Sequence, residues 1–371
     1  MVVKIFLGKG MIRILHILGS LNRGGSETLA MNLYRKIDRT KVQFDFVKHL
    51  SQKCAYEDEI TSMGGKIYLA PRYKIYNHFS YCRWWIEFLQ EHPEYKIVHG
   101  HYFTIASVFF KIAKKFGCKT IAHSHHTPPK KIFSNVINRL YTRNLEHYSD
   151  YGFACSQNAG EWIFKKMPFS VLNNAIDSGQ YVFSEENRKQ IRKEFHLEGK
   201  FVVGNVGGLR PPKNQSFLID VFAKVHQKKS DAVLMIVGSG SLENALSEKV
   251  SKMGLAEFVI FTGSRPDIPA LLSAMDVFIF PSLWEGLGIA AIEAQASGLH
   301  VICSDVLPKE TKVTDLIEYK SLSDSAGVWA DSVMKYAESY ERQNMQQYIV
   351  DAKYDINAVA NWLQNFYLKI L

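Results

Sequence analysis

Short apolar runs alternate with amphipathic stretches along most of this 371-residue chain. Apolar runs bounded by turns indicate buried strands, and apolar residues recurring every three or four positions indicate helices. In the first half, this pattern predicts strands over residues 12–18, 42–50, 66–71, 96–102 and 119–126. Helices are predicted between them over 26–37, 56–64, 84–92 and 105–117, with Ser26 as the N-cap of the first. The alternation is typical of a parallel, doubly wound α/β sheet.

A second series of the same kind follows a polar, turn-rich segment. We expect residues 169–199 to be a linker that separates an N-terminal domain (1–168) from a C-terminal one (200–350). The second series predicts strands over 200–209, 232–240, 258–263, 277–282 and 300–305, with helices over 214–226, 242–254, 268–275 and 288–298. Residues 356–371 predict an amphipathic helix that packs back on the N-terminal domain or lies against a membrane surface.

Composition excludes several protein classes. With 47% hydrophobic and 22% charged residues, the chain is globular, and it has no apolar run of the roughly 20 residues that span a bilayer. We expect no signal peptide, and residues 1–10 are expected to be a misassigned start or a tag remnant, since Met11 opens a better first strand. The five cysteines are scattered without a CxxC pair, which predicts buried thiols in a reducing compartment.

Charge is unevenly distributed between the two halves. Residues 1–170 hold 25 lysines and arginines against 12 acidic residues, a net charge of +13, and the remainder carries −4. A basic half suits a phosphate-bearing partner such as nucleic acid, anionic lipid or a diphosphate substrate. Solubility alone is the simpler explanation.

Two glycine-rich loops follow predicted strands. One holds Gly19, Gly24 and Gly25 before the first helix, where backbone N–H groups can approach an anion. The other holds Gly238 and Gly240. Neither has the G-x-G-x-x-G spacing of dinucleotide-binding proteins, so a plain strand-to-helix turn remains an alternative for both.

Two cations follow the first strand of the second domain. Arg210 and Lys213 lie just beyond a double glycine, with Pro211 and Pro212 stiffening the loop between them. Ligands of parallel sheets bind at the carboxyl ends of strands, so both cations are candidates for binding a diphosphate. Solvated loop charges are the alternative.

The segment SLWEGLGIAAIEAQASG, residues 282–298, carries two carboxylates eight positions apart. Glu285 is predicted in the loop and Glu293 in the second turn of the following helix, which Gly298 ends. Carboxylates accept hydrogen bonds from paired sugar hydroxyls. The N–H groups of residues 287–289 begin the helix and suit a phosphate. A turn residue and a structural ion pair are the alternative roles for the two acids.

Ten of the 13 histidines precede residue 150. His99 and His101 end one predicted strand, and His123, His125 and His126 end another. Histidines at i, i+2 suit a metal site, but no carboxylate cluster accompanies them, and hydrogen bonding to a polar ligand is favoured. Burial as satisfied core histidines is the alternative.

With these segments, the chain resembles glycosyltransferase family 4, the GT-B group, and especially bacterial enzymes of capsule, exopolysaccharide or O-antigen assembly. The resemblance covers nearly the whole chain from Met11, and its most specific feature is the E-x7-E pair Glu285 and Glu293. It implies a GT-B fold of two Rossmann-like domains whose parallel sheets face each other across a cleft.

The resemblance also implies phosphate-binding positions. Gly24 and Gly25 would approach the donor diphosphate from the first domain and Lys213 from the second, while Gly288 and Ile289 would offer backbone N–H groups. Leu287 lies at the same start of the helix.

Other positions would contact the sugar, the ribose and the base. Glu285 would hold hydroxyls of the transferred sugar and Glu293 the ribose. His125 matches a histidine that contacts the sugar near the reaction centre, which makes His125 and Glu285 the candidate catalytic residues. Arg265 falls where the nucleobase is cradled, largely by backbone.

One departure from the family pattern concerns the diphosphate. The family commonly has an arginine where this chain has Gly208. Arg210 follows two residues later and is the candidate replacement. If it points away, donor binding depends mainly on Lys213.

The function implied is retaining transfer from a nucleotide sugar to a lipid-linked saccharide in bacterial surface polysaccharide biosynthesis. A UDP-sugar is the expected donor and a GDP-sugar the alternative, with no permanently bound cofactor. No divalent metal is expected, in agreement with the missing Asp-x-Asp pair. We expect a cytoplasmic protein held at the inner membrane face by its basic N-terminal half, without a nucleic-acid partner. A sugar-nucleotide 2-epimerase and a non-catalytic binder of sugar nucleotides or nucleic acid remain alternatives.

Overall fold

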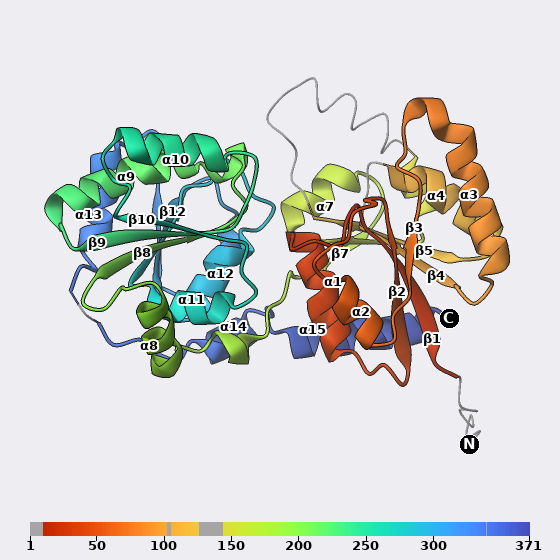
Figure 1. The fold of residues 1–371 in the computed structure, drawn as a ribbon. Helices are drawn as coiled ribbons and strands as arrows, with labels where there is room; N and C mark the ends of the chain where they lie inside the picture. Colours follow the sequence, from red (N-terminus) through yellow and green to blue (C-terminus); the bar gives the residue numbers. More distant parts are fainter. Residues whose placement is uncertain (1–9, 102–104, 126–143, 339) are drawn as a thin grey trace, which may run out of the picture. The chain divides into compact units, whose positions relative to one another are not determined.

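The computed structural model describes residues 10–101, 105–125, 144–338 and 340–371. The chain divides into two compact units (Figure 1). The N-terminal unit ends at Ile176 and takes in Asp355–Leu371 as well, and the C-terminal unit is Asp177–Tyr354. The chain therefore passes between the units twice.

The N-terminal unit is built on a parallel sheet of seven strands in the order β3-β2-β1-β4-β5-β6-β7, counted over the described residues. The strands are β1 (Ile12–Ile17), β2 (Val42–Lys48), β3 (Ile67–Leu69), β4 (Ile97–Gly100), β5 (Lys119–Ser124), β6 (Tyr151–Ala154) and β7 (Phe169–Val171). The helices are α1 (Gly25–Lys36), α2 (Glu57–Ser62), η1 (Ile75–Asn77), α3 (His78–Glu91), α4 (Ala106–Lys115), α6 (Leu145–Tyr148), α7 (Gln157–Ile163) and α15 (Ile356–Ile370).

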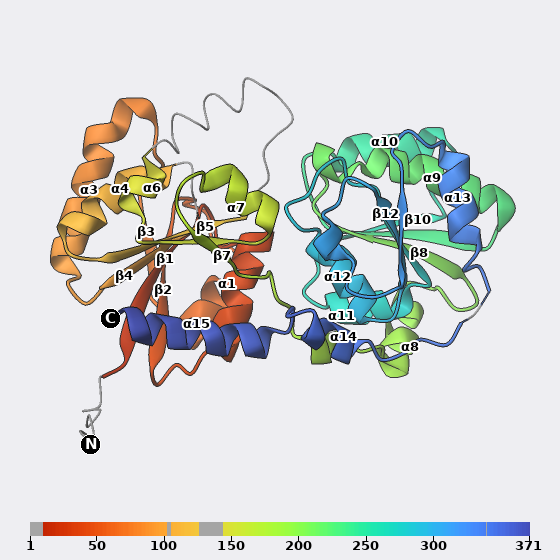
Figure 2. The same cartoon turned by 180° about the vertical axis from the view of Figure 1, so that it is seen from behind.

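Helices cover both faces of this sheet, so its strands are largely buried on both sides. In β1, Ile14 packs into the core beneath α1 and α15, whereas Leu15 and Ile17 pack into the core beneath α3 and α4. Figure 2 shows α15 running across the first of these faces. Asp355 caps α15 by accepting a hydrogen bond from the Asn357 N–H at 2.9 Å. The last helix of the chain thus completes the N-terminal core.

The C-terminal unit has a parallel sheet of six strands in the order β10-β9-β8-β11-β12-β13 within the described residues. The strands are β8 (Phe201–Val206), β9 (Ala232–Val237), β10 (Val259–Gly263), β11 (Val277–Phe280), β12 (His300–Ser304) and β13 (Ile317–Lys320). The helices are η3 (Ser178–Tyr181), α8 (Glu185–Glu194), η4 (Pro211–Lys213), α9 (Gln215–Lys228), α10 (Glu243–Lys252), α11 (Ile268–Ala274), α12 (Ile289–Ala296), η5 (Lys309–Thr311), α13 (Ala326–Met334) and α14 (Gln346–Asp351).

Each sheet has a point at which the chain reverses its direction of winding. In the N-terminal sheet β1 lies beside β4, and in the C-terminal sheet β8 lies beside β11. The loops that follow such neighbouring strands diverge and leave room for a ligand at the carboxyl ends of the strands. The loops after β8 and β11 are the ones that hold Lys213 and Glu285.

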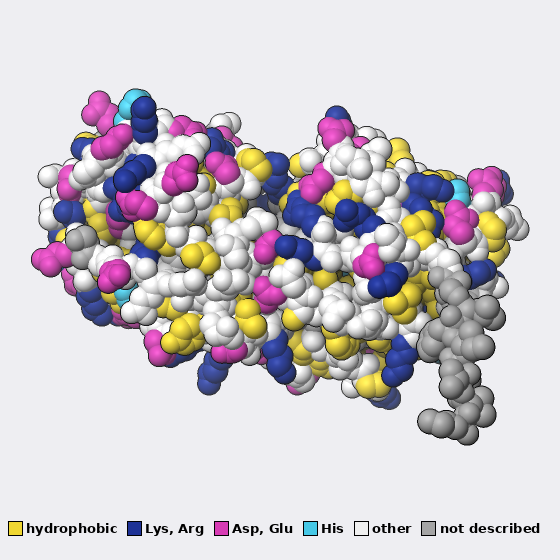
Figure 3. All heavy atoms as spheres, turned by 90° about the horizontal axis from the view of Figure 1, so that it is seen from below, with side chains coloured by type: hydrophobic (Ala, Val, Ile, Leu, Met, Phe, Trp, Pro, Cys, Tyr) yellow, Lys and Arg dark blue, Asp and Glu magenta, His cyan; other side chains and the backbone are white. Residues whose placement is uncertain are grey.

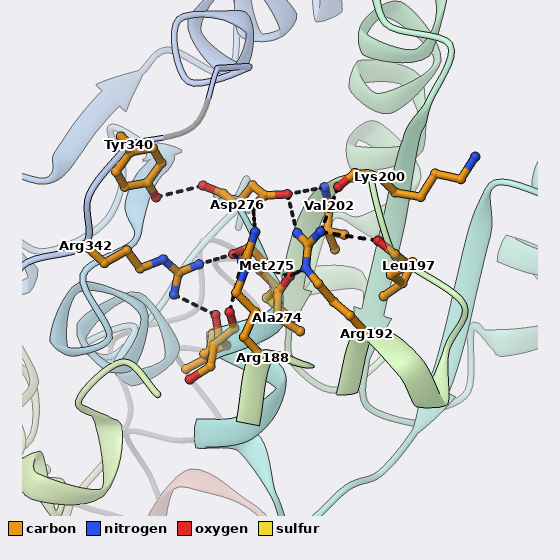
Figure 4. A network of polar contacts seen from close by, with 12 residues as sticks. Arg188, Arg192, Leu197, Lys200, Val202, Ala274, Met275, Asp276, Tyr340 and Arg342 are labelled. Atoms are coloured by element: carbon orange, nitrogen blue, oxygen red, sulfur yellow. Dashed lines mark hydrogen bonds and ion pairs between the residues drawn. The ribbon is translucent and has the colours of Figure 1, made fainter. Parts of the chain in front are cut away.

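A network of arginines centred on Asp276 fastens α8 to the C-terminal sheet (Figure 4). The Asp276 carboxylate accepts hydrogen bonds from Arg188 at 2.6 Å, from Arg192 at 2.7 Å and from the Val202 N–H at 2.7 Å. Arg342, farther along the chain, donates to the carbonyls of residues 272, 275 and 297. Burial lowers the pKa of Arg342 to about 10. These contacts tie three separate segments together.

The predicted linker over residues 169–199 is wrong. Residues 169–171 form β7, and α8 belongs to the C-terminal unit, which begins at Asp177 instead of residue 200 and extends to Tyr354 instead of residue 350. The segment looks like a linker because α8 is charged and buries mainly Ile191 and Arg192.

Two further sequence predictions have definite outcomes. The N-cap of α1 is Gly24, not Ser26, whose hydroxyl donates to Glu27 in the first turn instead. All five cysteines are free thiols, as predicted, and four of them are buried, whereas Cys82 is only partly buried. Among the described helices, none combines the length and the apolar character needed to cross a bilayer.

Candidate active site

The loops after β8 and β11 are held together by their backbones. The Leu283 N–H donates to the Pro212 carbonyl at 2.8 Å, and the Asn214 amide donates to the Pro281 carbonyl at 3.1 Å. Asn214 adopts a left-handed conformation with φ of 55°, which asparagine tolerates better than most residues. The side chains that the two loops carry are therefore held in fixed proximity.

Lys213 and Glu285 form an ion pair across this junction. The Lys213 Nζ lies 2.6 Å from the Glu285 Oε1, which also accepts a hydrogen bond from the Ser282 hydroxyl at 2.7 Å. The ammonium group lies 4.9 Å from the centre of the Phe280 ring. The structure thus brings together Lys213, the candidate for binding the diphosphate, and Glu285, the candidate for binding the transferred sugar.

Glu293 lies in α12 and is almost fully buried, with 8% of its surface exposed. Burial raises the pKa of its carboxyl to about 7, although the Tyr181 hydrogen bond and the Lys213 charge oppose this shift. The Tyr181 hydroxyl donates to the Glu293 Oε1 at 2.8 Å. A buried carboxyl that accepts few hydrogen bonds within the protein can still accept hydrogen bonds from the hydroxyl groups of a ligand.

The start of α12 offers backbone donors beside these carboxylates. Gly288 is the N-cap and has φ of 83°, a conformation that favours glycine. Within the described part of the chain, the N–H groups of Leu287, Gly288 and Ile289 have no hydrogen-bond acceptor. The predicted position of Gly298 just beyond the helix is confirmed, with φ of 72°.

The second glycine loop packs against the loop after β8. A Cβ atom at Gly238 would lie 2.2 Å from the Gly207 carbonyl oxygen, and one at Gly240 would lie 2.4 Å from the Leu209 carbonyl oxygen. Both glycines therefore permit a close approach of two backbones, which accounts for them without a ligand. A ligand role for this loop stays untested.

Arg210 is exposed and has no ion-pair partner among the described residues. Its Nε lies 3.7 Å from the position that a Cβ atom at Gly208 would occupy. The Arg210 side chain therefore passes beside the position that holds the arginine in the family pattern.

Arg265, in contrast, is paired within its own unit. Its guanidinium lies 2.8 Å from Glu194 and 2.7 Å from Asp267, and these hydrogen bonds raise its pKa. It also lies 5.6 Å from the centre of the Phe195 ring. A contact with a base through the backbone, as the sequence predicts, remains a prediction.

In the N-terminal unit, the start of α1 has a carboxylate of its own. Gly24 and Gly25 begin the helix, and a Cβ atom at Gly24 would lie 2.5 Å from the Glu27 Oε2. Glu27 accepts hydrogen bonds from the hydroxyls of Ser20 at 3.2 Å and Ser26 at 2.7 Å. The sequence analysis missed Glu27, although an acidic residue in the first turn of a helix is a recognised signal.

His125 directly follows β5 and is buried, with 8% of its surface exposed. The structure brings it together with His101, His99 and His123, the other predicted histidines at strand ends, and with His16 of β1. His16 was not predicted to join them. His126 lies outside the described residues.

Comparison with known proteins identifies the family. The family description "Glycosyl transferases group 1" matches residues 186–351, and "Glycosyltransferase Family 4" matches residues 23–180. EpsF of Bacillus subtilis (strain 168), a glycosyltransferase by name, is 30% identical over 94% of this chain and 95% of its own. The chain belongs to the glycosyltransferases. The predicted enzyme class is thereby confirmed.

Two other relatives align with different fractions of this glycosyltransferase. The capsular polysaccharide biosynthesis glycosyltransferase CapH of Staphylococcus aureus is 24% identical over 96% of this chain and 99% of its own. The Escherichia coli UDP-Gal:alpha-D-GlcNAc-diphosphoundecaprenol alpha-1,3-galactosyltransferase is 29% identical over 59% of this chain and 60% of its own.

Solved structures share the fold. HepE of Anabaena, crystallised with UDP and glucose, superposes with a TM-score of 0.81 at 19% identity, covering 96% of this chain and 99% of HepE. WaaG, a glycosyltransferase involved in lipopolysaccharide biosynthesis, gives 0.71 at 16% identity, covering 95% and 99%. The predicted fold class, GT-B with two Rossmann-like α/β domains, is confirmed.

Proposed function

We propose that this glycosyltransferase transfers a sugar, with retention of anomeric configuration, from a nucleotide sugar to a lipid-linked saccharide in surface polysaccharide biosynthesis. The observation that carries the proposal is the Lys213–Glu285 ion pair at the point where β8 and β11 adjoin. The names of CapH and of the galactosyltransferase, and the UDP-glucose complex of HepE, support the pathway, the acceptor and a UDP-sugar donor, with a GDP-sugar as the alternative.

The diphosphate would bind where cations and N–H groups adjoin. Lys213 supplies a positive charge from the loop after β8. The N–H groups at the start of α12, which have no acceptor among the residues that the structure describes, add donors from the loop after β11. Arg210 fits as the second cation because its side chain lies beside Gly208. Gly24 and Gly25 would contact the diphosphate only if it has room next to the Glu27 carboxylate.

The two carboxylates would bind the two sugars of the donor. Glu285 faces Lys213, so hydroxyls of the transferred sugar would be held next to the phosphate that leaves. Glu293 is deeper and next to Tyr181, which suits the ribose diol. Arg265 would place the base through its backbone because its guanidinium is already paired.

In the reaction we propose, the bond from the anomeric carbon to the diphosphate oxygen breaks while the acceptor oxygen bonds to the same face of that carbon. The acceptor hydroxyl proton passes to the leaving phosphate, and a nucleoside diphosphate departs. The protein positions the reactants and stabilises the departing charge with Lys213 and the α12 N–H groups. His125 would contact the transferred sugar near the anomeric carbon.

The acceptor would bind the N-terminal unit. A cavity between helix α3 and the loops after β2 and β3 is lined by His49, Gln52, Arg72 and Trp84, among others. An indole and a guanidinium suit a saccharide and its phosphate. Replacing Trp84 with alanine should raise the KM for the lipid-linked acceptor while leaving donor binding unchanged.

Membrane association would come from the same unit. Ile75, Tyr76 and Phe79 are 75%, 81% and 86% exposed, and the exposed Arg72 and Lys74 flank them. Aromatic and basic side chains together suit the surface of an anionic bilayer at the cytoplasmic face. Figure 3 shows that lysine and arginine side chains also gather among apolar ones on another face of this unit.

Vesicle sedimentation tests the membrane proposal. Tyr76→Ser with Phe79→Ser should release the protein from phosphatidylglycerol vesicles, whereas Met253→Ser, at an exposed apolar residue of the C-terminal unit, should not. Equal binding of both variants would contradict this surface.

A thermal-shift panel of UDP-, GDP-, ADP- and dTDP-sugars tests the donor. A donor at about 100 times its Kd adds about 2.7 kcal/mol of stability, which is a shift of several degrees. Glu293→Ala should abolish the shift and Glu248→Ala, at an exposed carboxylate of α10, should keep it. Product analysis without acceptor then separates a transferase from a 2-epimerase. Absence of any shift in the folded protein would overturn the donor proposal.

A further inference from the structure

Tyr181 reaches the candidate ribose carboxylate from a part of the chain that the sequence analysis did not connect with the site. It ends η3, the first helix of the C-terminal unit, and lies 112 positions before Glu293. Its hydroxyl donates to the Glu293 Oε1 at 2.8 Å. η3 packs against α12, the helix that holds Glu293, and also against α11 and α14. The contact therefore joins two separate segments of the same unit.

The position of the Tyr181 hydroxyl is fixed by its surroundings. The Tyr181 ring is partly buried and packs against the hydrophobic core of the C-terminal unit. In η3, the Gln180 side chain donates to the Asp177 carboxylate at 2.8 Å, and the Gln180 N–H donates to the Asp177 carbonyl at 2.8 Å. The hydroxyl is thus held by a packed ring on a hydrogen-bonded turn, and Glu293 is not the only group that orients it.

The two carboxylate oxygens of Glu293 differ in their surroundings. Oε1 accepts the hydrogen bond from Tyr181. Oε2 accepts no hydrogen bond from the described residues, and it is not one of the enclosed polar atoms that lack a partner in that part of the chain. One oxygen of this nearly buried carboxylate is therefore occupied, and the other is open to a ligand.

This difference determines how the carboxylate can be oriented. The last torsion of a glutamate side chain is broad, so a carboxylate without partners can rotate. An ionised carboxylate only accepts hydrogen bonds, so the Tyr181 hydroxyl is the donor whenever Glu293 is charged. A donor on a packed ring restricts the rotation and fixes the direction in which Oε2 points. Binding groups work best when neighbouring side chains hold them in this way.

We propose that Tyr181 is a positioning residue of the donor site, which fixes the Glu293 carboxylate through Oε1 so that Oε2 faces the ribose diol. The proposal rests on the function proposed for Glu293. In the opposite arrangement, the Tyr181 hydroxyl would stand in the place of a ribose hydroxyl and would have to leave Glu293 when the donor binds. The open Oε2 favours positioning, because a ligand can reach the carboxylate without displacing the hydroxyl.

Tyr181 also affects the charge of Glu293. Burial raises the pKa of Glu293 to about 7, whereas the hydrogen bond from Tyr181 and the charge of Lys213, the two titratable groups that influence it among the described residues, oppose this rise. Tyr181→Phe removes one of the two opposing contributions, so the pKa of Glu293 should rise further. Because the ionised carboxylate is the better acceptor for the diol, the pH at which donor affinity increases should move upward in the variant.

Calorimetry of the full-length protein with UDP and with 2′,3′-dideoxy-UDP, which lacks the diol, tests the proposal; GDP and its dideoxy form replace them if the donor panel selects GDP. Tyr181→Phe keeps the packed ring and removes only the hydroxyl. At pH 7 the variant should bind UDP roughly tenfold more weakly than the wild type and bind dideoxy-UDP equally well. Tyr319→Phe, at an enclosed hydroxyl of β13 without a hydrogen-bond partner among the described residues, should leave both affinities unchanged.

The pH dependence and the kinetics complete the test. The pH at which UDP affinity increases should be higher for Tyr181→Phe than for the wild type, and this difference should be absent when both proteins also carry Glu293→Gln. With the UDP-sugar, Tyr181→Phe should raise the donor KM roughly tenfold with little change in kcat, because the ribose is bound alike in the ground state and the transition state.

The possible failures are distinguishable. Tighter UDP binding by Tyr181→Phe would mean that the hydroxyl competes with the ribose, and equal weakening of UDP and dideoxy-UDP would mean a purely structural role; either result would overturn the proposal. If Glu293→Ala loses UDP binding while Tyr181→Phe matches the wild type at every pH, the role of Tyr181 fails and the donor site stands. If the folded wild type binds no nucleotide, the proposed donor function fails, and the role of Tyr181 fails with it.

Discussion

Glu293→Gln should stabilise the ligand-free protein at alkaline pH and have little effect in acid. The pKa of Glu293 is raised from 4.5 to about 7 because the carboxyl is buried. Between these values the folded state binds more protons than the unfolded state, so stability falls as the pH rises through this window. With about 1.4 kcal/mol per pKa unit, ionising Glu293 costs the folded state about 3 kcal/mol above pH 7. Glutamine removes this cost and still accepts the Tyr181 hydrogen bond.

Thermal unfolding of the wild type and Glu293→Gln at intervals between pH 4.5 and 9 measures the effect. For a unit of this size, about 3 kcal/mol corresponds to a rise in Tm of roughly 6–12 °C. The difference between the two proteins should be near zero at pH 4.5, grow through pH 7 and then stay constant. Glu248→Gln, at an exposed carboxylate of the same unit, should give no such rise.

The same substitution should weaken donor binding, because the ionised carboxylate is the better acceptor for the ribose diol. Wild-type affinity for the donor should therefore increase from pH 6 to pH 8, and that of Glu293→Gln should not. A difference in Tm that is the same at pH 5 and pH 8 would refute the reasoning, since it would mean that Glu293 has the same protonation state throughout.

Three other substitutions have defined outcomes. Glu285→Gln removes the partner of Lys213. The variant should bind UDP at least as tightly as the wild type does, but it should lose the additional affinity that an attached sugar provides. Calorimetry with UDP and with the UDP-sugar measures both affinities. Asp276→Asn breaks a partly buried carboxylate–arginine network and should destabilise the C-terminal unit by about 3 kcal/mol in denaturant titrations. Gly240→Ala places a Cβ atom 2.4 Å from the Leu209 carbonyl oxygen, so its backbone must move and its Tm should fall.

The regular elements were predictable where the apolar pattern is long. The runs of β8 and β9 and the helix that holds Glu293 were found because each is apolar and buried over almost its whole length. β7 and β13 were missed because polar residues interrupt their apolar runs, Ser170 in β7 and Glu318 and Lys320 in β13, so that no run stands out from the turns. β6 was not predicted either. α8 was missed for a different reason. It is held by salt bridges to Asp276, an interaction that leaves no apolar stripe in the sequence.

The candidate site was predictable as a set of residues but not as a set of contacts. Glu285 and Glu293 follow from their spacing, yet the partner of Glu285 lies 72 positions away. The group of buried histidines described at the candidate site depends on β1 lying beside β4, and no local sequence pattern determines the order of the strands. His16 could therefore not be assigned to the group before the fold was known.

If the proposed donor site is correct, the Lys213–Glu285 ion pair would hold its lysine in place before the ligand binds. A lysine left alone in this loop would lose its side-chain freedom only when the diphosphate binds, whereas here Glu285 has already ordered it. In the proposed site, the diphosphate would compete with Glu285 for the ammonium group, and the carboxylate that gives up this partner would become able to accept hydrogen bonds from sugar hydroxyls. Binding of the phosphate and recognition of the sugar would then be coupled through one pair of side chains. Such coupling would favour the complete nucleotide sugar over the nucleoside diphosphate that leaves.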